Sequence, residues 1–253
     1  MTQNKFAQKV THFGYEAPPT ENSMQRCASQ NPQLAAHQYD LMNDLMSLGI
    51  HRLWKRFAIE LSGARQGQIL LDLAGGTGDL AIKLSRMTGS NGLVVLADSS
   101  EPLLQVGRER SLECGFASAV QYVQTRAECL PFPNDLFHCI TLSFSLQNIT
   151  QKVDALAEIH RTLRPGGRLL ILEFSKPTRP LFSRLYDSYS FILPLLGKWI
   201  TEDDSLYQQF AGSIRRHPDP IALRNTLQKA GFCRCDYHTL SGGIVAVHRG
   251  FKL

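Results

Sequence analysis

The chain has 253 residues, with 27 Lys and Arg against 22 Asp and Glu, and a formal net charge of +5. Hydrophobic residues make up 43% of it and charged residues 19%, which excludes a disordered or low-complexity protein. The length suits one large domain or two small ones. The small basic excess does not by itself indicate nucleic-acid binding, because it fits an anionic membrane surface or an anionic ligand equally well.

Residues 1–33 are polar and lack periodicity, so we expect an arm or a cap there. From Ala35 to Leu61, apolar residues recur at helical steps, and Gly49 is expected to divide this stretch into two helices. Residues 1–62 are therefore predicted to form an N-terminal arm with cap helices. The amino terminus has no apolar stretch of signal-peptide length, which favours a cytoplasmic location.

Residues 67–175 alternate short apolar runs with helical segments that glycines punctuate. Ile69–Leu73 is almost continuously apolar, which is typical of a strand covered on both faces. Further strands are expected at Leu93–Ala97, Val120–Val123, Cys139–Phe144 and Arg168–Phe174, and helices at Asp79–Met87, Pro102–Cys114 and Val153–Leu163. This alternation favours a parallel sheet with right-handed crossovers, and hence a doubly wound α/β fold.

The alternation stops after Pro177. Residues 178–216 carry aromatic and apolar residues at helical spacing and are predicted to form a helical insertion. A helix over 221–230 follows, and then two strands, 233–240 and 244–247, joined by a short Ser-Gly-Gly connection typical of antiparallel pairs. We find no internal repeat and no linker, so residues 1–253 are interpreted as a single domain.

The six cysteines are scattered and form no Cys-x-x-Cys pair, so no metal site is expected. The longest uncharged apolar stretch, 188–197, has about half the length that a membrane-spanning helix needs. The sequence therefore predicts a protein that does not cross a membrane.

A glycine-rich loop lies between the first strand and its helix, at the edge of the sheet where α/β proteins bind ligands. Its residues are Asp72, Gly75, Gly76, Thr77 and Gly78. Glycines let the backbone approach a ligand closely and turn sharply into the helix. Because the loop also satisfies the dinucleotide pattern, it cannot by itself distinguish a nicotinamide cofactor from S-adenosylmethionine.

Asp98 ends the second predicted strand, 22 residues after Gly76. A carboxylate there can accept hydrogen bonds from both hydroxyls of a ribose. Asp98 could instead, or at the same time, be the N-cap of the next helix, a role for which Ser99 and Ser100 compete. The Arg126–Ala127 pair follows the third strand, where an adenine would lie, and Ser143 ends the fourth strand.

Two features favour methyl transfer over hydride transfer. An Arg-Pro-Gly-Gly turn precedes the fifth strand, and an antiparallel pair closes the chain, as in class I methyltransferases. No Tyr has a Lys four residues later, as a short-chain oxidoreductase would require. The corner after the fourth strand contains no proline, unlike the corner typical of methyltransferases that act on bases of nucleic acids.

Several segments resemble the ubiquinone/menaquinone biosynthesis C-methyltransferases over nearly the whole chain. The segments that carry the resemblance are Thr11–Gly14, Tyr39–Arg56, Leu71–Asp79, Leu130–Pro133, Leu163–Arg168, Leu172–Pro177 and Val247–Gly250. The resemblance implies a class I methyltransferase (Rossmann-like) fold, S-adenosylmethionine as the methyl donor, and a polyprenylated benzoquinol or naphthoquinol as the acceptor. By the family pattern, Thr77, Asp98, the Arg126–Ala127 pair and Ser143 contact the donor.

The chain departs from the family pattern after the fourth strand. The family tends to have Phe-Gly-x-Arg-Asn, whereas this chain has Phe144, Ser145, Leu146, Gln147 and Asn148. The family arginine lies next to the transferable methyl, and a neutral glutamine lacks its charge and its fixed fork of donors. Both Gln147 and Asn148 are nevertheless the candidate catalytic residues, through contact with the acceptor or with an activating water. More distant candidates are Tyr39, Asp40, His51, Tyr186 and Tyr189.

Three alternatives remain open from the sequence. The chain could methylate a quinol, methylate a different small or lipidic acceptor, or act as a weakly active quinone-binding partner. Basic residues that flank 178–216 could contact anionic headgroups, which predicts a peripheral membrane association, or could form a solvated face. A homodimer or an assembly with other quinone-biosynthesis proteins is also possible, whereas a nucleic-acid partner is not expected.

Overall fold

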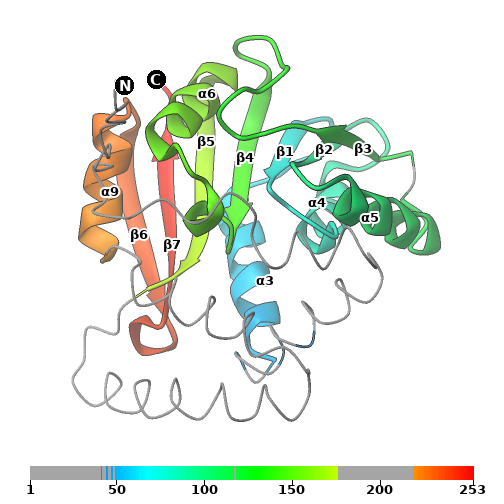
Figure 1. Ribbon diagram of the computed structural model, residues 1–253, viewed down its shortest axis with the longest axis horizontal. Coiled ribbons are helices and arrows are strands. Elements are labelled where there is room, and N and C mark those ends of the chain that lie inside the picture. Colours follow the sequence, from blue (N-terminus) through cyan, green and yellow to red (C-terminus); the bar gives the residue numbers. More distant parts are fainter. Residues whose placement is uncertain (1–40, 42–43, 45–46, 48, 117, 176–218) are drawn as a thin grey trace, which may run out of the picture.

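The computed structural model describes residues 41, 44, 47, 49–116, 118–175 and 219–253. Its described strands form one seven-stranded sheet of order β3-β2-β1-β4-β5-β7-β6 (Figure 1). The strands are β1 (Ile69–Leu73), β2 (Leu93–Asp98), β3 (Val120–Gln124), β4 (Phe137–Ser143), β5 (Leu163–Phe174), β6 (Cys233–Leu240) and β7 (Val245–Phe251). β1 to β5 pair in parallel, and β7 pairs antiparallel with both β5 and β6. The predicted doubly wound sheet with an antiparallel C-terminal strand is thus confirmed.

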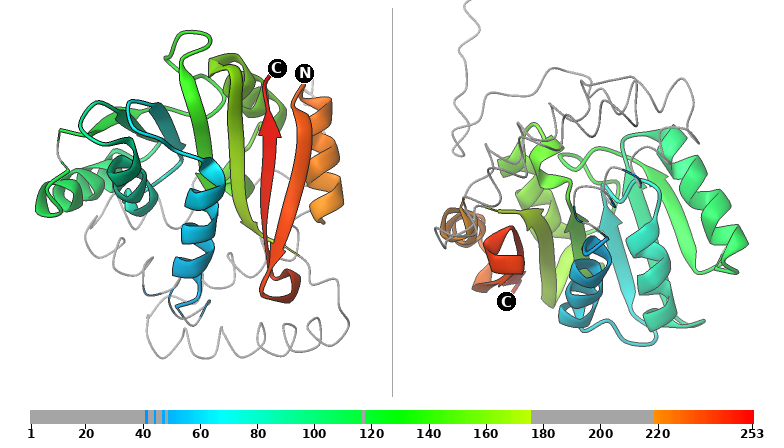
Figure 2. Two further views of the ribbon diagram at one scale, coloured as in Figure 1. Left: turned by 180° about the vertical axis from the view of Figure 1, so that it is seen from behind. Right: turned by 90° about the horizontal axis from the view of Figure 1, so that it is seen from below.

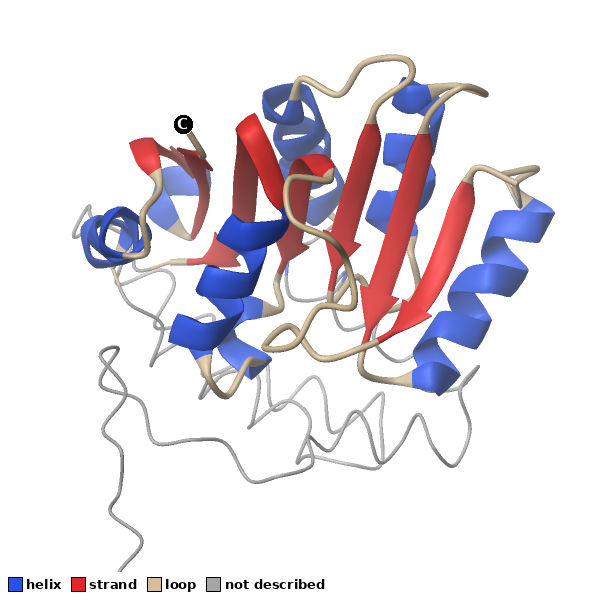
Figure 3. Cartoon of the chain, turned by 90° about the horizontal axis from the view of Figure 1, so that it is seen from above, coloured by secondary structure: helices blue, strands red, loops and turns tan. Residues whose placement is uncertain are grey.

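Helices cover both faces of this sheet (Figure 3). One face packs against α3 (His51–Ser62), α4 (Asp79–Thr88) and α5 (Glu101–Glu113), in a core that includes Trp54, Leu84 and Leu104. The other face packs against α6 (Lys152–Thr162) and α9 (Pro220–Lys229), in a core that includes Leu156 and Leu223. Successive residues of β1 alternate between the two cores, as the pleat of a doubly covered strand requires.

Local sequence signals account for where several elements begin. Gly49 has φ +75°, and α3 begins two residues later, as predicted for a break at this glycine. α9 begins after Asp219, whose Oδ1 accepts a hydrogen bond from the Ala222 backbone N–H at 2.8 Å, with Pro220 as the first helical residue. The continuous apolar run at Ile69–Leu73 has the bounds predicted for β1.

The predicted start of the fifth strand was wrong. The proline and two glycines of 164–167 suggested a loop, but β5 already begins at Leu163. Leu163 pairs with Phe137, and the next pair is Arg168 with Cys139, so the intervening residues form an irregularity in the ladder rather than a loop before it.

The predicted arm at 1–33 and insertion at 178–216 lie outside the described residues. Within the described part of the chain, no helix is long and apolar enough to cross a membrane. The same part contains no group of three or more His, Cys, Asp or Glu side chains that could hold a metal ion. Figure 2 shows the described elements from behind and from below.

Candidate active site

The glycine-rich loop follows β1 and leads directly into α4. A Cβ added at Gly75 would lie 2.5 Å from both Asp72 Oδ2 and Leu96 Cδ1, so no larger residue fits there without movement. Gly76 and Gly78 have φ of +55° and +78°, which side chains other than glycine rarely adopt. The close contacts at Gly75 and the positive φ of Gly76 and Gly78 account for glycine at these three positions.

Asp98 holds the loop at the end of β2. Its Oδ2 accepts a hydrogen bond from Gly76 N at 2.9 Å, and its Oδ1 accepts one from Ser100 N at 2.9 Å. Burial raises the pKa of Asp98, while these backbone N–H groups act in the opposite direction. The N-cap residue of α5 is Ser100, so of the three candidates for this role Ser100 is confirmed and Asp98 was wrong.

Asp72 lies beneath the loop and is fully buried. Thr141 Oγ1 of the adjacent β4 donates a hydrogen bond to Asp72 Oδ1 at 2.8 Å. Among the described residues, Asp72 Oδ2 has no hydrogen-bond partner. Burial raises the pKa of Asp72 to about 7. The sequence did not single out Thr141, because the contact joins residues of two strands that are far apart along the chain.

The other predicted donor-binding residues lie around the carboxyl ends of β1 to β4. Thr77 is buried, and its Oγ1 accepts a hydrogen bond from Arg110 Nη1 at 3.0 Å. Ala127 is also buried, whereas the side chain of Arg126 is exposed and lies 3.5 Å from Glu128. Ser143 is the last residue of β4, next to β1 in the sheet. The structure therefore places these residues at the end of the sheet where the parallel strands have their carboxyl termini.

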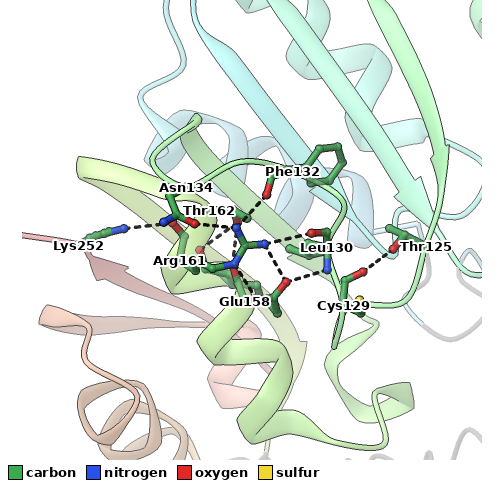
Figure 4. A network of polar contacts seen from close by, with 10 residues as sticks. Thr125, Cys129, Leu130, Phe132, Asn134, Glu158, Arg161, Thr162 and Lys252 are labelled. Atoms are coloured by element: carbon green, nitrogen blue, oxygen red, sulfur yellow. Dashed lines mark hydrogen bonds and ion pairs between the residues drawn. The ribbon is translucent and has the colours of Figure 1, made fainter.

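Arg161 of α6 fixes the connection from β3 to β4 that carries Ala127 (Figure 4). Its guanidinium donates to the carbonyl oxygens of Leu130 and Phe132 at 3.0 and 2.8 Å. It also pairs with Glu158, whose other oxygen accepts the Leu130 N–H at 2.8 Å. These hydrogen bonds anchor the connection to α6 through several of its backbone groups.

Gln147 and Asn148 lie in a short 3-10 turn, Leu146–Asn148, directly after β4. Gln147 is buried, and its Oε1 has no hydrogen-bond partner within the described ranges. Asn148 is exposed, and its backbone N–H donates to Ser145 O at 2.9 Å. Phe144, before the turn, has φ +55°, and its ring lies 4.7 Å from that of Phe174. The two predicted catalytic residues are thus adjacent but differ in burial.

The sequence analysis missed Glu173, a fully buried carboxyl near the end of β5. Its Oε1 accepts a hydrogen bond from Leu146 N at 2.7 Å, at the start of the turn that carries Gln147. Burial raises the pKa of Glu173 to about 8. A single charged residue within the apolar run 169–174 was the signal that could have identified it.

Of the more distant candidates, only His51 lies among the described residues; Tyr39, Asp40, Tyr186 and Tyr189 do not. His51 is buried on α3, where its Nδ1 lies 2.8 Å from Ser47 Oγ. Burial lowers its pKa. Its burial and its contact with Ser47 are those of a residue that packs within the helical cap.

The strand order, the antiparallel β7 and the glycine loop at the end of β1 together define a class I methyltransferase. A solved structure of this class, described as a SAM-dependent methyltransferase from Aquifex aeolicus, has a TM-score of 0.61 at 17% identity, covering 84% of this chain and 98% of that one. At 17% sequence identity, this structural similarity establishes the fold alone.

The family follows from the sequence comparisons. The ubiE/COQ5 methyltransferase family matches residues 29–252, and the chain belongs to this family. It is 55% identical over 247 residues to the ubiquinone/menaquinone biosynthesis C-methyltransferase UbiE of Stutzerimonas stutzeri, covering 97% of this chain and 96% of that protein. It is 51% identical over 244 residues to the UbiE protein of Hahella chejuensis, covering 96% of this chain and 98% of that protein.

Proposed function

We propose that this protein transfers a methyl group from S-adenosylmethionine to a ring carbon of a polyprenylated benzoquinol or naphthoquinol. The observation that carries the proposal is 55% identity across almost the entire length to a protein named as a ubiquinone/menaquinone biosynthesis C-methyltransferase. The intact glycine loop and the Asp98 carboxylate support the donor part of the proposal.

The loop residues suit the chemistry of the donor. Bound S-adenosylmethionine would supply an electrophilic methyl group on a positively charged sulfur. Asp72 Oδ2 is a buried acceptor that no described group satisfies, and it suits a cationic donor directly or through water. Asp98 suits the ribose hydroxyls, and the buried Ala127 suits the adenine.

Carbon methylation of a quinol depends mainly on positioning. The ring carbon must lie in line with the methyl–sulfur bond, water must be excluded, and a phenolic proton must leave. In this proposal, Gln147 and Asn148 contact the acceptor or an activating water. The amide of Gln147 orients such a group without adding charge, unlike the arginine of the family pattern.

The proposal is tested in two steps. Isothermal titration with S-adenosylmethionine should show binding at a single site, and its absence at millimolar donor would remove the donor assignment. Methylation of a demethylated quinol is then measured by mass spectrometry, in vitro and in a strain that lacks its own quinone methylase. Donor binding without restored quinone would instead favour an acceptor other than the quinol, or a quinone-binding partner of low activity.

A polyprenyl acceptor also motivates the proposal of peripheral membrane contact. The contact is assigned, on sequence alone, to residues 178–216 and the basic residues around them, which lie outside the described part of the chain. Flotation with anionic vesicles, compared with a variant that lacks 178–216, tests it. Sedimentation of the purified chain tests the proposed homodimer.

A further inference from the structure

Glu173 lies on a face of β5 that is otherwise apolar. It shares this face with Leu169 and Ile171, which belong to the core beneath α6 and α9. Glu173 itself is fully buried. An ionisable group in such a place costs free energy of folding unless its interactions compensate. The contacts of its carboxyl therefore indicate what the residue does.

The carboxyl of Glu173 binds the backbone of the turn after β4. Leu146 N donates to Glu173 Oε1 at 2.7 Å, and the Ser145 N–H also bonds to this carboxyl. On the other side of the strand, the ring of Phe174 packs against the ring of Phe144. Two successive residues of β5 thus hold both ends of the short segment that leads to Gln147.

Several buried polar atoms gather at this end of β4 and β5. The Oγ atoms of Ser143, Ser145 and Ser175 and the second oxygen of Glu173 have no hydrogen-bond partner among the residues that the structure describes. Gln147 Oε1 belongs to the same group. Buried polar atoms in proteins are nearly all bonded, so a concentration of unsatisfied ones is typical of a site that a polar ligand completes.

We propose that Glu173 is a positioning residue for methyl transfer: its carboxyl fixes the Ser145–Asn148 turn and so places Gln147 and Asn148 relative to the transferable methyl group. The proposal rests on the proposed function for the identity of the reaction. Glu173 acts through the turn: among the described residues, its carboxyl contacts the backbone of this turn and not the loop of Gly75, Gly76 and Gly78. Its loss should therefore affect the transfer step more than donor binding.

The test compares Glu173→Leu and Glu173→Gln with the wild type in the full-length protein. Leucine fills a similar volume but leaves the Leu146 N–H unpaired, whereas the amide oxygen of glutamine can still accept it. We expect Glu173→Leu to lower kcat by about 100-fold, while the Kd for S-adenosylmethionine and the KM for the quinol change less than about 3-fold. Glu173→Gln should restore kcat to within about 10-fold of the wild type.

The matched control is Glu60→Gln, which removes an exposed carboxyl on α3 and should leave all three constants unchanged. Wild-type kcat in Glu173→Leu would overturn the proposal. The proposal would also be overturned if the affinity for S-adenosylmethionine fell by the same factor as kcat, because such a result would indicate general damage to the fold.

A second measurement does not depend on the acceptor or on Glu173→Leu folding. At about pH 9, where Glu173 is ionised, hydrogen exchange of a peptide that spans 144–149 should be about 5-fold faster at the Leu146 amide in Glu173→Gln than in the wild type. The reason is that a charge-assisted hydrogen bond becomes a neutral one. Unchanged exchange would overturn the proposal. If the wild type methylates no quinol, the proposed function fails, and exchange alone then decides whether Glu173 holds the turn.

Discussion

Lys55 Nζ of α3 lies 2.8 Å from Asp79 Oδ2, at the first residue of α4. The helix before the sheet is thereby tied to the helix that the glycine loop enters. The second carboxylate oxygen of Asp79 lies 2.7 Å from Lys83 Nζ. Burial alone would raise the pKa of Asp79, but the charge of Lys55 and hydrogen bonds from Lys55 and Lys83 hold it well below its usual range.

Lys55→Met should destabilise the protein by about 1–3 kcal/mol near neutral pH, because a partly buried ion pair loses one partner while Asp79 keeps Lys83. Because the pKa of Asp79 is lower in the folded than in the unfolded state, the ionised carboxylate stabilises the protein above the unfolded pKa of about 4. This stabilisation is lost as the pH falls further and Asp79 becomes protonated. The difference from wild type should therefore shrink below about pH 4. Urea unfolding across pH measures it. Arg56→Met, which breaks an exposed pair on α3, is the control and should cost less than about 1 kcal/mol.

Gly75→Ala should weaken S-adenosylmethionine binding by more than about 10-fold, because a Cβ would meet Asp72 Oδ2 and Leu96 Cδ1 at 2.5 Å and must displace the loop. Isothermal titration measures the change. The control is Gly166→Ala, at a glycine that has φ +76° and no atom within 4 Å of an added Cβ. It should cost about 1 kcal/mol of stability and leave donor affinity intact. Equal affinity losses in both variants would contradict the role assigned to Gly75.

Glu173 should make the wild type less stable as pH rises. Burial raises its folded pKa to about 8, so between about pH 4.5 and pH 8 the folded state holds a proton that the unfolded state has released. Stability should fall across this window by at most about 1.4 kcal/mol per pH unit. Lys152 faces Glu173 from α6 and lowers the pKa of this carboxyl.

The comparison of Glu173→Gln with the wild type isolates the contribution of Glu173, because Asp72 and Lys152 are present in both. The glutamine variant should show a flatter dependence on pH and gain stability relative to the wild type toward pH 8. Parallel curves, measured by denaturant unfolding, would show that Glu173 is not protonated in the folded protein.

Gln147→Met should lower kcat by about 10- to 100-fold and leave donor affinity unchanged, because methionine retains the length of the side chain but removes its amide. Steady-state kinetics with a demethylated quinol and titration with the donor separate the two effects. Gln228→Met, on the exposed side of α9, is the matched control. Full activity in Gln147→Met would remove Gln147 from the acceptor site and leave Asn148 as the candidate.

Features determined by neighbouring residues could be predicted from the sequence. The apolar run of β1, the break at Gly49 and the glycine loop depend on local geometry, and each was correctly placed. The contacts of Asp72 with Thr141 and of Lys55 with Asp79 were not predicted, because they join segments that only the folded sheet brings together. Burial likewise raises the pKa of a carboxyl group, and the sequence alone did not reveal that Glu173 faces the core.

The place of β7 in the sheet has a consequence for biosynthesis. β7 is the last strand along the chain, yet it lies between β5 and β6 and pairs with both. Trp54 Nε1 of α3 also donates to Ser241 Oγ, across 187 residues of sequence. A ribosome must therefore synthesise nearly the whole described chain before the sheet can close, and until then β5 exposes an unpaired edge. Nascent chains stalled before residue 245 should accordingly be the species that most need a chaperone.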